Sequence, residues 1–259
     1  MSKLNKVALT LGWGAVVFAG CGILYFGFSG SIEGKLDSQG CLPPELVSNS
    51  MAFVIDKTDP FSLRYGMSIK KNILREVERL QRGEPISVYV LTNKVDSNVS
   101  PIYKFCYPGK PSDNIASQSI TKAKYEYKEK MAPFEVYLES LAKAESYHGS
   151  PILESMKGIS YSKELNEGHH TTLHIYSDFR QYSHELGIKL VRKANSAQIH
   201  RFKVHATERL DNFSGRDVHM HFIPIKITNG TSPNVLRELW MDAFTDAGAN
   251  ADWSHLSSY

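Results

Sequence analysis

A strong excess of charge of one sign is missing from this sequence. Lys and Arg together number 30, and Asp and Glu number 27, so the formal net charge of the 259 residues is +3. Basic residues lie beside acidic ones, as in the stretch 70–79, which is typical of a solvated helix face. No nucleic-acid partner is therefore predicted. Internal repeats and low-complexity tracts are also lacking, so neither a repeat protein nor a biased tract is expected.

Cysteine is scarce, with three residues in the chain. Cys21 lies in an apolar N-terminal segment, which leaves Cys41 and Cys106 in the remainder. Neither has a neighbouring His and acid in the sequence, so a catalytic thiol is not predicted. In an oxidising compartment these two could form one disulfide, whereas elsewhere they would be buried free thiols. The sequence leaves both alternatives open.

One long apolar run stands near the N-terminus. Residues 7–28 carry no charge over 22 positions, and Lys3 and Lys6 precede them. That length crosses the hydrocarbon core of a bilayer, whereas the apolar region of a cleaved signal peptide is shorter. We predict an N-terminal tail at 1–6 and a single transmembrane helix at 7–28. The two lysines favour a cytoplasmic N-terminus and a periplasmic or extracytoplasmic domain, with the cytoplasmic side as the alternative.

The rest of the sequence predicts a tether at 29–50, one domain at 51–248 and a C-terminal tail at 249–259. Short apolar runs alternate with helical patterns inside the domain. This alternation predicts an α/β fold with a doubly wound, mainly parallel sheet, its first strand central and helices on both faces. We expect strands at 52–55, 86–91, 102–106 (a returning edge strand), 173–176 and 218–225, and helices at 61–82, 121–147 (broken near Pro133), 152–165 (with Ser150 as its N-cap) and 236–248.

Polar side chains follow two of the predicted strands. Residues 56–60 (Asp-Lys-Thr-Asp-Pro) come after the first strand, and residues 177–178 (Ser-Asp) come after the fourth. Ligands bind in the crevice outside the carboxyl ends of parallel strands, so acids there indicate a site. Carboxylate and hydroxyl oxygens suit Mg²⁺ or Ca²⁺ better than zinc. The alternative is that Asp56 and Asp178 are N-caps of the helices that follow.

These residues resemble the metal-ion-dependent adhesion site of the von Willebrand factor A-type domain, which has the integrin I-domain fold. That family uses an Asp-x-Ser-x-Ser turn after the first strand, a Thr that opens a later helix, and an Asp after the fourth strand. The third position of the turn is Pro60 here, which has no hydroxyl, so metal affinity is expected to be weakened. The resemblance covers about residues 50–248, and its matching positions are Asp56, Thr58, Ser150 and Asp178.

The resemblance implies a divalent ion, Mg²⁺ or else Ca²⁺ or Mn²⁺, held by Asp56, Thr58, Ser150 and Asp178. Such a shell leaves coordination positions for a carboxylate of a partner. No activated nucleophile with an adjacent base belongs to the set, so the site is predicted to bind and not to catalyse. We therefore expect a membrane-anchored protein-interaction module that docks a protein partner at the carboxyl edge of its sheet, within an envelope assembly.

A second resemblance is catalytic and remains the alternative. Asp56, Lys57 and Thr58 after an apolar strand also resemble the nucleophile turn of haloacid-dehalogenase-like phosphotransferases, including the Asp-Lys-Thr-Gly-Thr turn of P-type ATPases. In that interpretation Asp56 carries the phosphoryl group, Mg²⁺ is required and Asp178 is a metal ligand. Most such phosphatases place a second Asp two positions after the first and end the late strand in paired acids, whereas this chain has Thr58 and a lone Asp178.

Two histidines, His219 and His221, alternate in the predicted strand 218–225 and so share a face. No Cys or acid at ligand spacing accompanies them in the sequence. They are therefore expected to be surface or half-buried histidines and not a transition-metal pair.

Overall fold

A computed structural model of the chain describes residues 35–94, 99–114, 120–141, 149–166, 170–225 and 229–257. The predicted transmembrane helix at 7–28 lies outside these residues. Within them, no helix combines the length and the apolar character that a membrane crossing requires. The chain divides into two units, Met1–Leu36 and Asp37–Tyr259, and the second unit holds all the elements described below.

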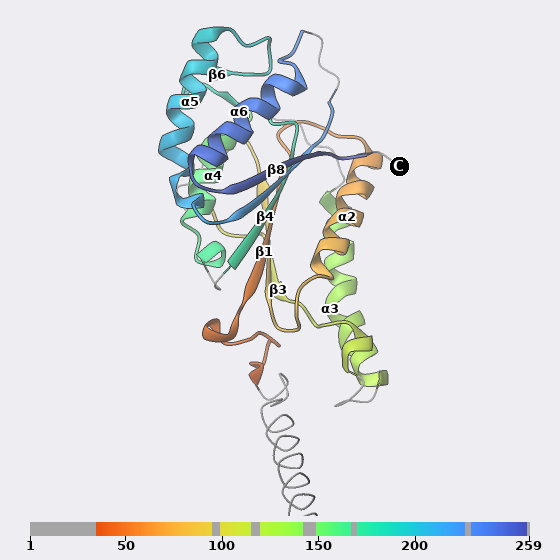
Figure 1. The fold of residues 1–259 in the computed structure, drawn as a ribbon. Coiled ribbons are helices and arrows are strands. Elements are labelled where there is room, and N and C mark those ends of the chain that lie inside the picture. Colours follow the sequence, from red (N-terminus) through yellow and green to blue (C-terminus); the bar gives the residue numbers. More distant parts are fainter. Residues whose placement is uncertain are drawn as a thin grey trace, which may run out of the picture. The chain divides into compact units, whose positions relative to one another are not determined.

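Six strands form the central sheet, in the order β3-β2-β1-β4-β7-β8 (Figure 1). All neighbouring pairs are parallel except β2 with β3. The predicted α/β fold, with a mainly parallel sheet, a central first strand and an antiparallel edge strand, is confirmed. The strands are β1 (Asn49–Asp56), β2 (Pro85–Leu91), β3 (Tyr103–Cys106), β4 (His170–Ser177), β7 (Asp217–Phe222) and β8 (Asn250–His255).

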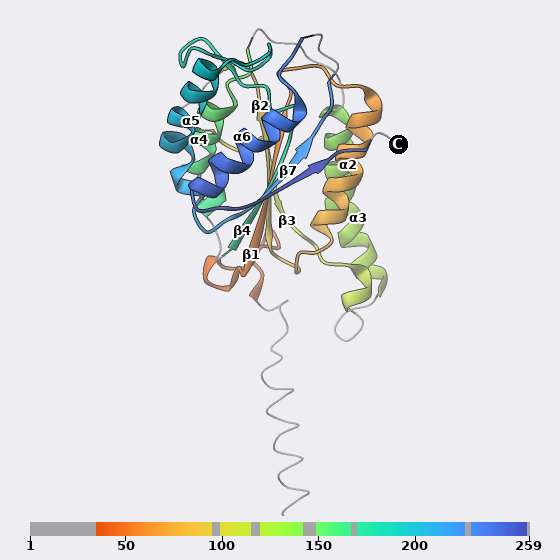
Figure 2. The same cartoon turned by 45° about the horizontal axis from the view of Figure 1, so that its top comes forward.

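Helices cover both faces of the sheet (Figure 2). Alternate side chains of a strand point to opposite faces, so β1 feeds two cores. Ala52 and Val54 pack into the core under α4, α5 and α6, whereas Phe53 and Ile55 pack into the core under α2 and α3. The helices are α2 (Leu63–Val77), α3 (Ile120–Leu141), α4 (Ile152–Ser160), α5 (Ser196–Leu210) and α6 (Pro233–Asp246).

The C-terminal segment 249–259, expected as a tail, contains strand β8. It pairs with β7 in parallel, from Asp217 with Asn250 to Phe222 with His255. Only Ala251 and Trp253 of this strand pack toward the core beneath α6. An edge strand with one exposed face gives a weak apolar signal, which is why the sequence pattern missed it.

Two helix expectations near the middle of the chain were wrong. Helix α3 continues through Pro133, because Met131 and Phe134 on either side are buried and hold the helix against the sheet although proline lacks a backbone donor. Ser150 does not cap α4, since its backbone pairs with Tyr182 in an antiparallel bridge and Pro151 is the N-cap.

Helix α5 and a short hairpin were not predicted at all. The hairpin joins β5 (Tyr182–Ser183) to β6 (Ile188–Lys189). Helix α5 buries Phe202, Ala206 and Leu210, which recur every four residues and could have revealed it.

Part of the expected tether at 29–50 belongs to the folded unit. A disulfide joins Cys41 to Cys106 at the end of β3, which decides between the two alternatives left open above. The Leu42 amide donates to the carbonyl of Gly83 at 2.9 Å, and Val47 is buried. The segment that precedes β1 is therefore fastened to the edge of the sheet.

Candidate functional site

The predicted site residues converge at the carboxyl ends of β1 and β4. These strands are direct neighbours in the sheet, with Ile55 opposite Tyr176. Asp56 is the last residue of β1, and Asp178 follows the last residue of β4. Ser150 reaches the same edge because its backbone is fixed to Tyr182 by two hydrogen bonds of 2.9 and 2.8 Å.

The Asp56 carboxylate lies at the centre of a network of hydroxyl groups. Its Oδ1 accepts from the Thr58 amide at 2.9 Å and from the Thr58 hydroxyl at 2.5 Å. Its Oδ2 accepts from the Ser177 hydroxyl at 2.6 Å. Thr58 Oγ1 in turn lies 2.8 Å from Ser150 Oγ. Three of the four predicted site residues are thus linked through Thr58, and Ser177 joins them at Asp56.

Asp178, the fourth predicted residue, is held by Arg180, which sequence reasoning missed. Asp178 Oδ2 accepts from Arg180 Nη1 at 2.8 Å, and Oδ1 accepts from the Arg180 amide at 3.0 Å. Both side chains are buried. An acid followed two residues later by Arg after a buried strand was the available signal for this pair.

The loop after β4 has a strained backbone at Phe179. This residue has a φ of 57°, in the left-handed region that bulky side chains rarely adopt. The Ser177 hydroxyl accepts from the Phe179 amide at 2.8 Å, and the Phe179 carbonyl accepts from Trp240 Nε1 at 2.9 Å. The surrounding contacts therefore maintain a conformation of the kind that clusters at functional sites.

Burial and mutual repulsion disfavour the charged forms of the carboxyls. Burial raises the pKa of Asp56 to about 6, and the nearby Asp178 adds to this, against the hydrogen bonds from Ser177 and Thr58. The pKa of Asp59 is also raised to about 6, by burial and then by Asp178 and Asp56. Burial raises the pKa of Asp178 too, although Arg180 opposes this. A bound cation would relieve this repulsion.

The alternative that these acids are helix N-caps does not hold for Asp56. The N-cap of α2 is Ser62, whose hydroxyl accepts from the Tyr65 amide at 3.5 Å. Asp56 instead accepts from residue 58, within its own turn. Its carboxylate therefore serves the cluster at the sheet edge and not a helix.

The donor set fits a hard cation in its chemistry. It offers the carboxylates of Asp56 and Asp178 with the hydroxyls of Thr58 and Ser150, all oxygen ligands of the kind that Mg²⁺ and Ca²⁺ prefer. Pro60 contributes no hydroxyl. Over the described ranges, no three His, Cys, Asp or Glu side chains are grouped as a metal cluster, so any ion here would depend on the hydroxyl groups as well.

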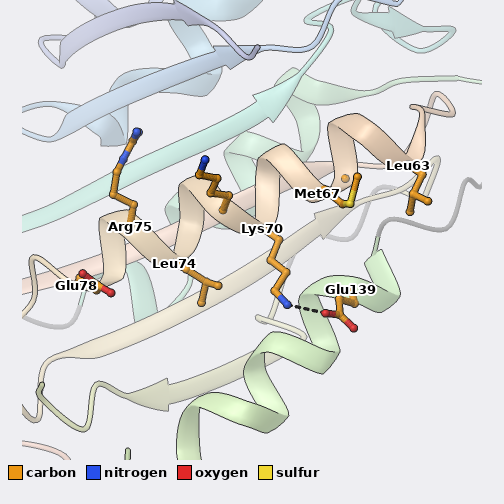
Figure 3. Close-up of a pocket in the computed structure, with 9 residues that line it drawn as sticks. Leu63, Met67, Lys70, Leu74, Arg75, Glu78 and Glu139 are labelled. Carbon is orange, nitrogen blue, oxygen red and sulfur yellow. Dashed lines mark hydrogen bonds and ion pairs between the residues drawn. The ribbon is translucent and has the colours of Figure 1, made fainter. Parts of the chain in front are cut away.

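A separate groove of about 670 Å³ runs along the outer face of α2 (Figure 3). Leu63 and Met67 leave 66% and 55% of their surfaces exposed there. Lys70 reaches across to Glu139 of α3, with 2.6 Å between Nζ and Oε1. None of the predicted site residues lines this groove.

No protein family matches the sequence, and no curated protein matches it. Among solved structures, an aerotolerance-related membrane protein from Bacteroides fragilis is 12% identical, with 81% of this chain and 92% of that chain covered and a TM-score of 0.41. A von Willebrand factor type A structure from Catenulispora acidiphila is 12% identical over 82% of this chain and 39% of that one, with a TM-score of 0.39. The hypothetical protein BatB from Bacteroides thetaiotaomicron is 11% identical over 82% and 91%, with a TM-score of 0.37. These values are too low to carry a functional conclusion.

Proposed function

We propose that this chain is a membrane-anchored protein-interaction module that docks a protein partner over the carboxyl edge of its sheet, as part of an envelope assembly. The observation that carries the proposal is the contact of Asp56, Thr58, Ser150 and Ser177, residues from three separate parts of the chain. Such convergence of buried polar groups at a strand edge is typical of a binding site.

A divalent ion of the Mg²⁺ type would be held by Asp56, Thr58, Ser150 and Asp178. When bound, it would supply a positive centre that attracts an oxygen ligand from outside the chain. The raised pKa values of Asp56 and Asp59 support this, because carboxyls that repel one another gain from a cation. A carboxylate on the partner is the ligand that best suits the remaining positions of a hard cation.

Binding fits the arrangement better than turnover does. Both oxygens of Asp56 already accept hydrogen bonds, and its side chain is buried. The neighbouring hydroxyl groups donate to this carboxylate or contact each other. The group that accepts from the Thr58 and Ser177 hydroxyls is Asp56 itself, and among the described residues no histidine contacts either hydroxyl to activate it as a nucleophile.

The experiment compares the purified full-length protein with its Asp56→Asn variant, which keeps the side-chain shape and removes the charge. We expect Mg²⁺ to raise the melting temperature of the wild type and to have little effect on the variant. The matched control is Asp242→Asn, because Asp242 forms an exposed ion pair with Lys203 on α5. Affinity capture in Mg²⁺ should retain a partner with the wild type and the control but lose it with Asp56→Asn.

Two outcomes would contradict the proposal. Equal capture by wild type and Asp56→Asn would place the docking surface elsewhere. Mg²⁺-dependent hydrolysis of a generic phosphoester that Asp56→Asn abolishes would favour the phosphotransferase alternative, in which Asp56 is the nucleophile.

The orientation of the domain is part of the same proposal. We propose that the domain lies on the periplasmic or extracytoplasmic side, and the disulfide between Cys41 and Cys106 supports this, since disulfides persist in an oxidising compartment. A thiol reagent that cannot cross the membrane should label these cysteines in intact cells only after reduction. Labelling that requires lysis of the cells would place the domain in the cytoplasm.

A further inference from the structure

A second hollow, which we call the histidine cleft, lies between α2 and the strands β4, β7 and β8. Its volume is about 640 Å³. It is separate from the site at the sheet edge, since none of Asp56, Thr58, Ser150 and Asp178 lines it. It is lined by Ser68 and Arg75 of α2, by Arg79 just after this helix, by His174 of β4, and by His219 and His221 of β7, among others.

Strand register explains why three imidazoles meet here. His174 lies opposite His219 in the pairing of β4 with β7. Their rings stack with centroids 4.8 Å apart, and the His174 and His221 rings stack at 5.4 Å. The alternate residues Val218 and Met220 face the opposite core under α5 and α6. The shared face predicted for His219 and His221 is therefore confirmed, and His174 completes it.

A chain of hydrogen bonds runs from β8 into the cleft. Ser254 Oγ lies 2.9 Å from His221 Nδ1, and His221 Nε2 lies 3.1 Å from His174 Nδ1. This series of hydrogen bonds ends at His174 Nε2, which is buried and has no hydrogen-bond partner among the described residues. Ser68 Oγ, on the facing helix, is likewise buried without a partner in the part of the chain that the structure describes. Buried polar atoms of this kind call for a partner such as water, an ion or a ligand.

The charge of the lining decides which kind of ligand fits. Three formal positive charges, on Lys71, Arg75 and Arg79, face two negative ones, on Glu76 and Asp252. Both acids are already paired: Glu76 lies between Arg75 and Arg79, at 3.2 and 2.6 Å, and His219 lies 2.7 Å from Asp252. The remaining positive charge repels a metal cation and attracts an anion.

The imidazoles add hydrogen-bond donors without adding charge. Burial, with smaller contributions from neighbouring histidines and arginines, lowers the pKa of His174 to about 2 and that of His221 to about 4, although Asp252 opposes the shift at His221. At neutral pH this pair is uncharged and shares one proton between His221 Nε2 and His174 Nδ1. When His221 donates that proton, His174 keeps its own on Nε2 and presents it to the cleft.

We propose that the histidine cleft binds a phosphate group, either free or carried by a small organic molecule. The guanidinium groups of Arg75 and Arg79 supply its counter-charge, and the Ser68 hydroxyl and His174 Nε2–H donate hydrogen bonds to its oxygens. A phosphate group has enough acceptor oxygens to satisfy both orphaned side chains and an arginine together. Bidentate pairing of arginine with phosphate provides the geometric match.

The experiment is a calorimetric titration of the full-length protein with inorganic phosphate and, separately, with glycerol 3-phosphate. A titration with sodium chloride at the same ionic strength is the control. Ser68→Ala removes a donor that has no partner among the described residues, so the fold should tolerate it. We expect Ser68→Ala to weaken phosphate binding by about tenfold, as for a lost hydrogen bond to a charged group. His174→Asn should weaken it at least as much, while Ser140→Ala, in a serine that bonds the carbonyl of Tyr137 on α3, should leave it unchanged.

Tighter binding of glycerol 3-phosphate than of inorganic phosphate would identify a phosphate ester as the ligand, and the reverse would identify the free ion. Either result supports the proposal. Absence of heat with both probes would overturn it, as would equal affinity in the wild type and Ser68→Ala. Binding of Zn²⁺ that His174→Asn abolishes, without binding of phosphate, would show a cation site and overturn it as well.

Discussion

The carboxylate site (Asp56, Thr58, Ser150 and Asp178) and the histidine cleft both border β4. Burial nevertheless shifts the pKa values of their titratable groups in opposite directions. At the sheet edge, where β1 and β4 end side by side, burial raises the pKa of Asp56 and Asp59 to about 6. In the middle of β4, burial lowers the pKa of His174 to about 2. Loss of solvent disfavours charge in both places, but the residual charge of the surroundings is negative in one and positive in the other.

One sheet therefore presents two polar regions whose surroundings carry charge of opposite sign. The sheet edge repels added negative charge and suits a cation. The histidine cleft has Arg75 and Arg79 along one wall and suits an anion. Changes in residue charge should therefore affect the two regions in opposite ways.

The largest expected effect is at the buried pair of Arg180 and Asp178. Arg180→Gln leaves the Asp178 carboxyl buried without its counter-charge, which should lower the free energy of unfolding by about 3–5 kcal/mol. Denaturant unfolding of the full-length protein measures this change. The double variant Arg180→Gln with Asp178→Asn should recover part of the loss. A loss below about 1 kcal/mol for Arg180→Gln would mean that Asp178 does not depend on this partner.

The next largest effect should come from Ser177, which donates to Asp56 at 2.6 Å. Ser177→Ala should destabilise the fold by about 1.5–3 kcal/mol at pH 8, where Asp56 is ionised, because a hydrogen bond to a charged group is lost. At pH 5 the loss should be smaller, since the carboxyl is then mostly protonated. A loss that is independent of pH would contradict this role.

The comparison of the two regions also predicts opposite dependences of stability on pH. His221 has a folded pKa of about 4, below its unfolded value, so its contribution to stability is present above pH 6.5 and lost as pH falls. Asp56 has a folded pKa of about 6, above its unfolded value, so its contribution grows as pH falls from 6 to 4. The charged groups that act on His221 are Arg75, His219 and Asp252.

Two variants separate these contributions. Between pH 6 and pH 4, the protonation linked to His221 should lower the free energy of unfolding of the wild type by up to about 1.4 kcal/mol per pH unit, and His221→Gln should abolish this decrease. The protonation of Asp56 should raise the free energy of unfolding by a similar amount, and Asp56→Asn should abolish this increase. Thermal or denaturant unfolding at several pH values measures both slopes. If both substitutions change the slope of the free energy of unfolding against pH in the same direction, the opposite behaviour of the two regions is contradicted.

The smallest effect is expected at Asp252, which is paired with His219 at 2.7 Å but has a side chain that is 61% exposed. Asp252→Asn should change the free energy of unfolding by less than about 1 kcal/mol, because solvent screens exposed ion pairs. It should strengthen phosphate binding in the histidine cleft by removing a negative charge. Weaker phosphate binding in this variant would count against the charge argument.

The sequence indicated that the polar residues of the sheet edge lie close together, but it did not indicate that the three histidines meet, and the reason is physical. Asp56, Thr58 and Asp178 follow buried strands directly, so a local pattern places them at the sheet edge. His174 meets His219 only through the register of β4 with β7, two strands that are far apart in the sequence. Local patterns contain no information on such pairing.

The fold shows the same limit. The central strands are continuous apolar runs and were predicted, whereas β8 and its partly exposed face were assigned to a tail. Arg180 was missed because its spacing from Asp178 permits a pair but does not show that both side chains are buried against each other. The expected membrane helix at 7–28 stays a prediction.

The most direct test of the central claim, a cation site at Asp56, is the release of protons when the full-length protein binds Mg²⁺ at pH 6. Near this pH, Asp56 and Asp59 are each about half protonated, so a cation should displace about one proton in total. Calorimetry in buffers of different ionisation enthalpy measures this number. We predict proton release in the wild type and a clear reduction in Asp56→Asn. Binding without proton release, or no binding of Mg²⁺, would contradict the account.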